Sequence, residues 1–154
     1  MRHAITLCGL LALAPMLTSC GDDEECVGAC ECRGTECQCP SSGDCAVRCV
    51  ADCDLECTGS GNCDFECGGG CFTGCRSSGE CVVDVGAAST VDCTGSGNCD
   101  IACHGDCTVM CQGSGDCVLR CDPDATCDIE SCSGEVTECP DGTTSICGTT
   151  ACPS

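Results

Sequence analysis

Apolar and polar residues alternate with a period of two along most of the chain. In the stretch "CDIACHGDCTVMC", residues 99–111, cysteines and small or apolar residues fill every second position, and mostly polar residues stand between them. Successive side chains of an extended strand point to opposite faces, so this alternation predicts strands with one buried face rather than helix. Residues 99–103 and 107–111 are therefore expected to be strands joined by a short turn.

The alternation belongs to a repeat of 18 residues, the last unit of which carries two extra residues. Five units share a Ser-Gly pair at one place: Ser42-Gly43, Ser60-Gly61, Ser78-Gly79, Ser96-Gly97 and Ser114-Gly115. One column of expected inward positions reads Val47, Phe65, Val83, Ile101, Leu119, and a second reads Leu55, Thr73, Val91, Val109, Ile129. Phe72 and Met110 are exceptions, because they fall at outward positions. Stacked repeats of this kind predict a β-solenoid, in which each unit covers the strand edges of its neighbours.

The expected fold class is all-β, a small disulfide-rich β-solenoid of about five 18-residue rungs over residues 39–132. Cysteine-rich caps are expected at 20–38 and 133–154. Each rung should comprise a strand, a tight turn, a second strand and a longer turn, in which Gly97 permits a positive φ and Ser96 can form a local hydrogen bond. The cross-section is open between two and three sides, and a disulfide knot without a regular solenoid is the alternative fold.

The composition explains why sulfur has to replace an ordinary core. The 154 residues include 28 cysteines but no Trp, no Tyr and only two Phe. Small domains without apolar bulk are usually held by disulfides or metals. The formal charge is −20, from 5 basic and 25 acidic residues, so the chain repels phosphates and no nucleic-acid partner is expected.

The N-terminal segment predicts export. "MRHAITLCGLLALAPMLTSC" has a basic start and an apolar run too short to span a bilayer, which is typical of a secretory signal. Its end, "LTSC" at Leu17–Cys20, resembles the lipobox of bacterial lipoproteins. That resemblance implies a signal peptide over 1–19, a lipid on Cys20, a tether within 20–38 and a membrane partner, with an outer-membrane lipoprotein of the bacterial cell envelope expected. The alternative is a plain secretory signal with Cys20 in a disulfide.

Export places the cysteines in an oxidising compartment. The 28 cysteines less Cys8 and Cys20 leave 26, an even number. The third unit lacks two cysteines together, at Val85 and Ser89, which preserves parity. Pairing across each turn predicts Cys49–Cys53, Cys67–Cys71, Cys103–Cys107, Cys121–Cys127, Cys39–Cys45, Cys57–Cys63, Cys75–Cys81, Cys93–Cys99 and Cys111–Cys117.

A rival pairing joins neighbouring units, for instance Cys49–Cys67 and Cys53–Cys71. It leaves five cysteines in one column, which then needs an outside partner: Cys45, Cys63, Cys81, Cys99 and Cys117. Pairing across turns is preferred because turn ends can supply the Cα separation that a bridge requires. The cysteines outside the pattern are expected to staple the two caps: Cys26, Cys30, Cys32, Cys37, Cys132, Cys139, Cys147 and Cys152.

Metal binding is the alternative function. The two C-x-C pairs of "CECRGTECQC", residues 30–39, have a spacing that resembles metallothioneins and would suit soft metals as thiolates. The Gly-Ser-Gly-Asn/Asp turns resemble, less closely, the calcium-binding β-rolls. The outward column there reads Asp44, Asn62, Glu80, Asn98, Asp116, and a polar ladder that needs no ion explains it equally well. No metal and no cofactor are expected in the preferred interpretation.

Catalytic residues are scarce. After removal of the signal His104 is the one histidine, lysine is absent, and no nucleophile elbow, zinc-protease helix or phosphate loop is present. His104 is expected to be a surface turn residue, and the protein is not expected to be an enzyme. The sequence predicts a structural or adhesive role at the cell envelope, with a protein partner on an extended surface.

Overall fold

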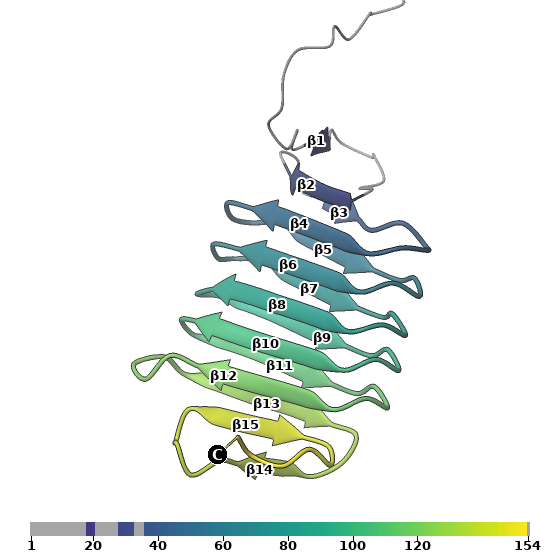
Figure 1. Ribbon diagram of the computed structural model, residues 1–154. Coiled ribbons are helices and arrows are strands. Elements are labelled where there is room, and N and C mark those ends of the chain that lie inside the picture. The colour runs from purple at the N-terminus through teal and green to yellow at the C-terminus, as the bar shows by residue number, and fades with distance from the viewer. Residues whose placement is uncertain (1–17, 21–27, 33–35, 154) are drawn as a thin grey trace, which may run out of the picture.

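The chain folds into a two-sided β-coil (Figure 1). The computed structural model describes residues 18–20, 28–32 and 36–153, with side chains described for 36–153. Every regular element in these ranges is a strand. The same ranges hold no helix with the length and apolarity to cross a membrane. The all-β prediction is confirmed.

Two sheets lie on opposite sides of the coil. Sheet A has the order β1 (Thr18–Cys20), β2 (Gly28–Cys32), β4 (Cys45–Cys49), β6 (Cys63–Cys67), β8 (Cys81–Gly86), β10 (Cys99–His104), β12 (Cys117–Cys121), β15 (Thr144–Cys147) and β14 (Val136–Glu138). Sheet B has the order β13 (Cys127–Cys132), β11 (Cys107–Cys111), β9 (Ser89–Cys93), β7 (Phe72–Cys75), β5 (Asp54–Cys57) and β3 (Glu36–Gln38). From β2 to β13 the chain alternates between the sheets, so each coil has two sides rather than three.

The 18-residue repeat sets the register of the stack. Cys45 pairs with Cys63 and Cys63 with Cys81 between parallel strands, as a β-solenoid requires. The parallel stack also begins before residue 39, because β2 pairs with β4 and β3 with β5. The segment 20–38, expected to form a cap, thus contributes a further coil.

The predicted core columns are confirmed. The nine residues at 0–1% exposure in these columns are Val47, Phe65, Val83, Ile101, Leu119, Leu55, Thr73, Val91 and Val109; Ile129, near the C-terminal end, is partly buried. Phe72 and Met110 are half-buried on outward positions. The strict alternation therefore places aliphatic side chains along the middle of the coil and sulfur at its two edges.

Gly97 does not use the positive φ that a glycine permits. The glycines with positive φ in the described part of the chain are Gly43, Gly69, Gly70, Gly142 and Gly148. Gly97 is instead required by a close approach, because a Cβ there would overlap the carbonyl oxygen of Gly79 in the preceding coil. The glycines of the longer turn thus allow successive turns to stack backbone on backbone.

The C-terminal segment caps the stack by reversing direction. β15 pairs antiparallel with β12, and β14 pairs antiparallel with β15. Two bridges, Cys132–Cys147 and Cys139–Cys152, staple this segment. The edge of β12 is thereby covered by the hairpin, and sheet A ends in β14, a strand of three residues, which is short enough to limit edge-to-edge association.

Candidate functional site: the stacked sulfur columns

Disulfides cross both turns of the coils. The nine bridges within the repeats have Cα–Cα distances of 5.8–6.6 Å. They are Cys39–Cys45, Cys49–Cys53, Cys57–Cys63, Cys67–Cys71, Cys75–Cys81, Cys93–Cys99, Cys103–Cys107, Cys111–Cys117 and Cys121–Cys127. Each of these cysteines is thus bridged across its own turn, as in the preferred pairing, and not to a cysteine of the next coil.

The bridges form two columns, one on each edge of the rod. The long-turn edge carries the bridges that close the longer turns, from Cys39–Cys45 to Cys111–Cys117, followed by Cys132–Cys147 of the cap. The short-turn edge carries the bridges from Cys49–Cys53 to Cys121–Cys127. Most of these sulfurs are buried, whereas Cys49, Cys121, Cys127 and Cys132 are partly accessible.

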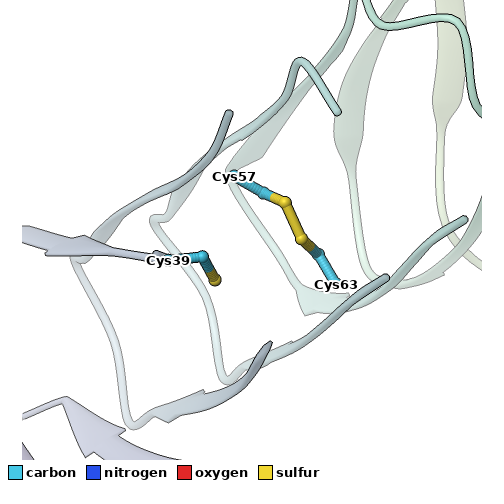
Figure 2. A group of neighbouring side chains, drawn as sticks. All are labelled: Cys39, Cys57 and Cys63. Carbon is cyan, nitrogen blue, oxygen red and sulfur yellow. A yellow bond between two sulfur atoms is a disulfide. The ribbon is translucent and has the colours of Figure 1, made fainter. Parts of the chain in front are cut away.

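Sulfurs of neighbouring coils lie close together. Figure 2 shows Cys39 beside the Cys57–Cys63 bridge of the next coil, and the three Sγ atoms lie within 4.8 Å of one another. Three further triads have the same limit: Cys49, Cys67 and Cys71; Cys75, Cys81 and Cys99; Cys103, Cys107 and Cys127. Each triad combines one complete bridge with one sulfur of an adjacent bridge.

The chemistry of the triads depends on whether their cysteines are reduced thiolates or oxidised disulfides. A soft metal ion would need them as thiolates, since the thiolate is the metal ligand, and all these cysteines are disulfide-bonded. The bridges would therefore have to be reduced before a metal could bind. In the oxidised form the same contacts bring a disulfide bond within reach of a neighbouring sulfur, which is an arrangement for disulfide exchange.

The missing bridge of the third coil is replaced by a packed pair. Val85 and Ser89 occupy the two cysteine positions and are 0% and 2% exposed. The Ser89 hydroxyl accepts a hydrogen bond from the backbone N–H of Cys71 at 3.2 Å. The gap in the sulfur column is therefore filled and hydrogen-bonded rather than hollow.

The outward column on the long-turn edge is a hydrogen-bonded ladder. Asp44, Asn62 and Asn98 each accept, through Oδ1, the backbone N–H of the residue 18 positions later, at 2.9–3.0 Å. The Asp116 carboxylate continues the ladder into the cap by accepting from the Thr149 backbone and the Thr150 hydroxyl. These bonds lower the pKa of Asp116, with the Thr150 hydroxyl as the largest cause. Four of the five side chains considered for calcium, those of Asp44, Asn62, Asn98 and Asp116, thus accept hydrogen bonds from the next coil or the cap.

The sequence analysis did not predict that two carboxylates hold the ring of His104, an arrangement called the His104 clasp below. The ring lies between the two carboxylates, with Nε2 3.2 Å from Asp84 Oδ1 and Nδ1 3.3 Å from Asp122 Oδ2. Hydrogen bonds to Asp84 and then Asp122 raise the pKa of His104. The spacing of 18 residues between His104 and Asp122 could have indicated one of these contacts. Asp84 lies in β8, two strands before His104 in β10 along the chain. Only the parallel pairing of β8 with β10 brings Asp84 near His104.

The surface is acidic, and its arginines are already paired. Arg48 contacts Glu66 at 2.8 Å, Arg76 contacts Glu56 at 3.0 Å, and Arg120 forms a two-pronged pair with Asp100. These are all the arginines for which side chains are described. Because the pairs are solvent-exposed, each contributes little to stability. They leave most carboxylates of the rod without a cationic partner.

Two predictions on the N-terminal segment fall largely outside the described residues. The signal sequence up to residue 17 and Cys26 lie there. Cys20 is the last residue of β1, and its backbone pairs with Cys32 in β2. The lipid on Cys20 therefore remains a prediction. Its position is at the end of sheet A opposite the C-terminal hairpin (Figure 1).

No protein-family model matches the chain, and neither the curated proteins nor the solved structures include a match. Function therefore has to be argued from the sulfur columns themselves. Disulfides in this number persist in oxidising compartments, which indicates an extracytoplasmic location. A disulfide-rich solenoid of this kind is typical of an extracellular structural protein.

Proposed function

We propose that the protein is a lipid-anchored structural rod of the bacterial cell envelope, without catalytic activity, which presents an acidic surface to a protein partner. The lipid is attached at Cys20 after removal of residues 1–19, and the membrane that holds it is the outer membrane. The observation that carries this proposal is the polarity of the stack, with Cys20 at one end and a stapled hairpin at the other.

That polarity separates the two ends of the rod. Cys20 ends β1 at one end of sheet A, and the β14–β15 hairpin covers the other end. The nine strands of sheet A span eight spacings, about 38 Å at roughly 4.8 Å each. An anchor at one end and a stapled cap at the other suit a rigid spacer that projects its sides to a partner.

The side faces favour a protein partner over nucleic acid. The described arginines are paired with carboxylates of their own chain, and the formal charge of the full sequence is −20. Such a surface repels phosphate backbones and attracts basic patches. The one described histidine is held between Asp84 and Asp122, which supports a structural role for that side chain rather than a catalytic one.

Fractionation of a bacterial host that expresses the full chain tests the anchor. The wild-type protein should be recovered from outer membranes, with an intact mass that lacks residues 1–19 and includes acyl chains. Cys20→Ser should release the protein into the soluble exported fraction. Cys8→Ser is the matched control, because it removes a cysteine from the same segment and should leave anchoring unchanged. Membrane recovery of Cys20→Ser would overturn the anchor, and recovery of the wild type from inner membranes would overturn the choice of membrane.

The rod itself is tested separately from the anchor. Alkylation of freshly isolated, unreduced protein with a maleimide should find no reactive thiols, since the bridges are expected to be complete. A large number of alkylated cysteines would contradict the disulfide-supported rod whatever the result for Cys20.

A further inference from the structure

The columns on the long-turn edge each have six members rather than five. In β15, Cys147 lies in register with Cys117, and in β13, Cys132 lies in register with Cys111. Cys132 and Cys147 are therefore the outside partners that these two columns need if cysteines are to pair between coils. One column reads Cys39, Cys57, Cys75, Cys93, Cys111, Cys132, and the other reads Cys45, Cys63, Cys81, Cys99, Cys117, Cys147.

Among the repeats of residues 39–132, the gap at Val85 and Ser89 divides the short-turn edge into even groups. Two cysteine-bearing coils of these repeats precede the gap and two follow it. Within each group the cysteines align between coils, as Cys49 does with Cys67 and Cys103 with Cys121. A gap in the second or fourth repeat would have left one repeat without a cysteine-bearing neighbour among the five.

We propose that the same twenty cysteines support a second complete pairing, between coils, which a small thiol can establish by disulfide exchange in the folded rod. The second set is Cys39–Cys57, Cys75–Cys93, Cys111–Cys132, Cys45–Cys63, Cys81–Cys99, Cys117–Cys147, Cys49–Cys67, Cys53–Cys71, Cys103–Cys121 and Cys107–Cys127. Neighbouring strands lie about 4.8 Å apart, which is within the Cα separation of roughly 4.4–6.8 Å that bridges span. The inference concerns the sulfurs alone and does not depend on the lipid anchor.

The exchange is balanced without any net oxidation. A thiolate RS⁻ attacks the partly accessible Cys49 Sγ, forms a mixed disulfide there and releases the Cys53 thiolate. The Cys53 thiolate attacks Cys71 Sγ, which forms Cys53–Cys71 and releases the Cys67 thiolate. Cys67 then attacks Cys49 Sγ, to which it lies within 4.8 Å, so that Cys49–Cys67 forms and RS⁻ leaves unchanged.

The two pairings have different mechanical consequences. A bridge across a turn closes a sequence separation of 4 or 6 residues within one coil and leaves neighbouring coils of the repeats joined by non-covalent contacts. A bridge between coils closes a separation of 18 residues and joins two coils covalently. Longer closed loops restrict the unfolded chain more strongly, so the second set should raise the free energy of unfolding more than the first set does. The rod thereby becomes cross-linked along its axis.

The test uses the intact protein and reduced glutathione at less than one equivalent. After incubation, thiols are blocked with a maleimide and the unreduced protein is cleaved after arginine and carboxylate residues. Before exchange, the peptide 49–52 should be joined to 53–54, and 67–76 should contain the Cys67–Cys71 bridge and be joined to 81–84 through Cys75. After exchange, 49–52 and 53–54 should both be joined to 67–76, with no increase in free thiols. A persistent link of 49–52 to 53–54 alone would overturn the proposal.

A double variant that copies the natural gap provides the control. In Cys67→Val with Cys71→Ser, the cysteines at 49 and 53 lose their exchange partners in the following coil and should stay bridged to each other in glutathione. Cys103–Cys121 and Cys107–Cys127 should still form in the same molecule. Cross-links from 49–52 to other peptides in this variant would indicate unordered scrambling, and would overturn the proposal too.

Discussion

The backbone N–H of Cys71 donates a hydrogen bond to the Ser89 hydroxyl, 3.2 Å away in the next coil. One coil earlier the corresponding N–H, that of Cys53, is directed at Cys71 Sγ at 3.5 Å. Ser89 therefore takes over the acceptor position of a cysteine sulfur where the column has no bridge. The relation shows how the coil tolerates the loss of a disulfide: the partner of the buried N–H is retained, and Val85 fills the remaining volume.

Replacing Ser89 with Ala should destabilise the rod by about 1–3 kcal/mol, because the buried N–H of Cys71 loses its acceptor. Urea unfolding followed by circular dichroism measures the change. Ser42→Ala, on an exposed turn of the first repeat, is the control and should shift the midpoint very little. Equal midpoints for the two variants would contradict a structural role for the Ser89 hydroxyl.

The double variant Val85→Cys, Ser89→Cys should complete the short-turn column with a further bridge. The added loop is of the same length as that of Cys67–Cys71, for which chain entropy predicts about 2 kcal/mol of added stability as an upper value. Thiol titration should find no additional free thiol, and the gain should disappear on reduction. Two reactive thiols in the purified variant would show that this position cannot hold a bridge.

Thr73→Val should stabilise the protein by about 1 kcal/mol. Thr73 is 0% exposed, and its Oγ1 is the one buried side-chain oxygen or nitrogen within 36–153 that has no hydrogen-bond partner. Its neighbours in the column, Leu55 and Val91, are aliphatic, so a methyl group suits the site. Thr108→Val, at a half-buried outward position of sheet B, should have little effect on the unfolding midpoint. A loss of stability in Thr73→Val would contradict this interpretation of the site.

Gly97→Ala should destabilise the stack by about 1–3 kcal/mol or prevent folding, because the added Cβ meets the Gly79 carbonyl of the preceding coil. Gly134→Ala is the matched control, since a Cβ there has no neighbour closer than 3.9 Å. Soluble yield and the urea midpoint report the difference. If both variants unfold alike, the turns of the protein in solution are not in backbone contact.

The His104 clasp predicts a pH-dependent contribution to stability. The folded pKa of His104 is raised above its unfolded value of about 6.5, first by Asp84 and then by Asp122. The stabilisation is therefore fully present below about pH 6.5 and is lost as the pH rises through the folded pKa. The difference in urea midpoint between wild type and His104→Gln should be larger near pH 6 than near pH 9. Because the ring is exposed, the effect should be small and should shrink in high salt. A difference that is independent of pH would contradict the clasp.

The local pattern of apolar and polar residues was sufficient to predict the β-solenoid. The period of two identified Ile101 and Val109 as core residues, and the 18-residue repeat predicted the parallel stack in which they lie. Side-chain direction in an extended strand follows from position alone, so no knowledge of distant contacts was required. The close approach at Gly97 was not predicted, because a turn glycine can serve either backbone conformation or close approach and the sequence does not distinguish them.

The sequence by itself determined the strands, the repeat length and the placement of sulfur at both edges, since these depend on residues near one another in the chain. Only the tertiary structure decided that the coil has two sides, that β2 and β3 join the stack, and that Cys147 returns to the long-turn column beside Cys117. The antiparallel return of β15 and the meeting of His104 with Asp84 depend on how separate segments pack, and periodicity carries no information about a segment that leaves the repeat.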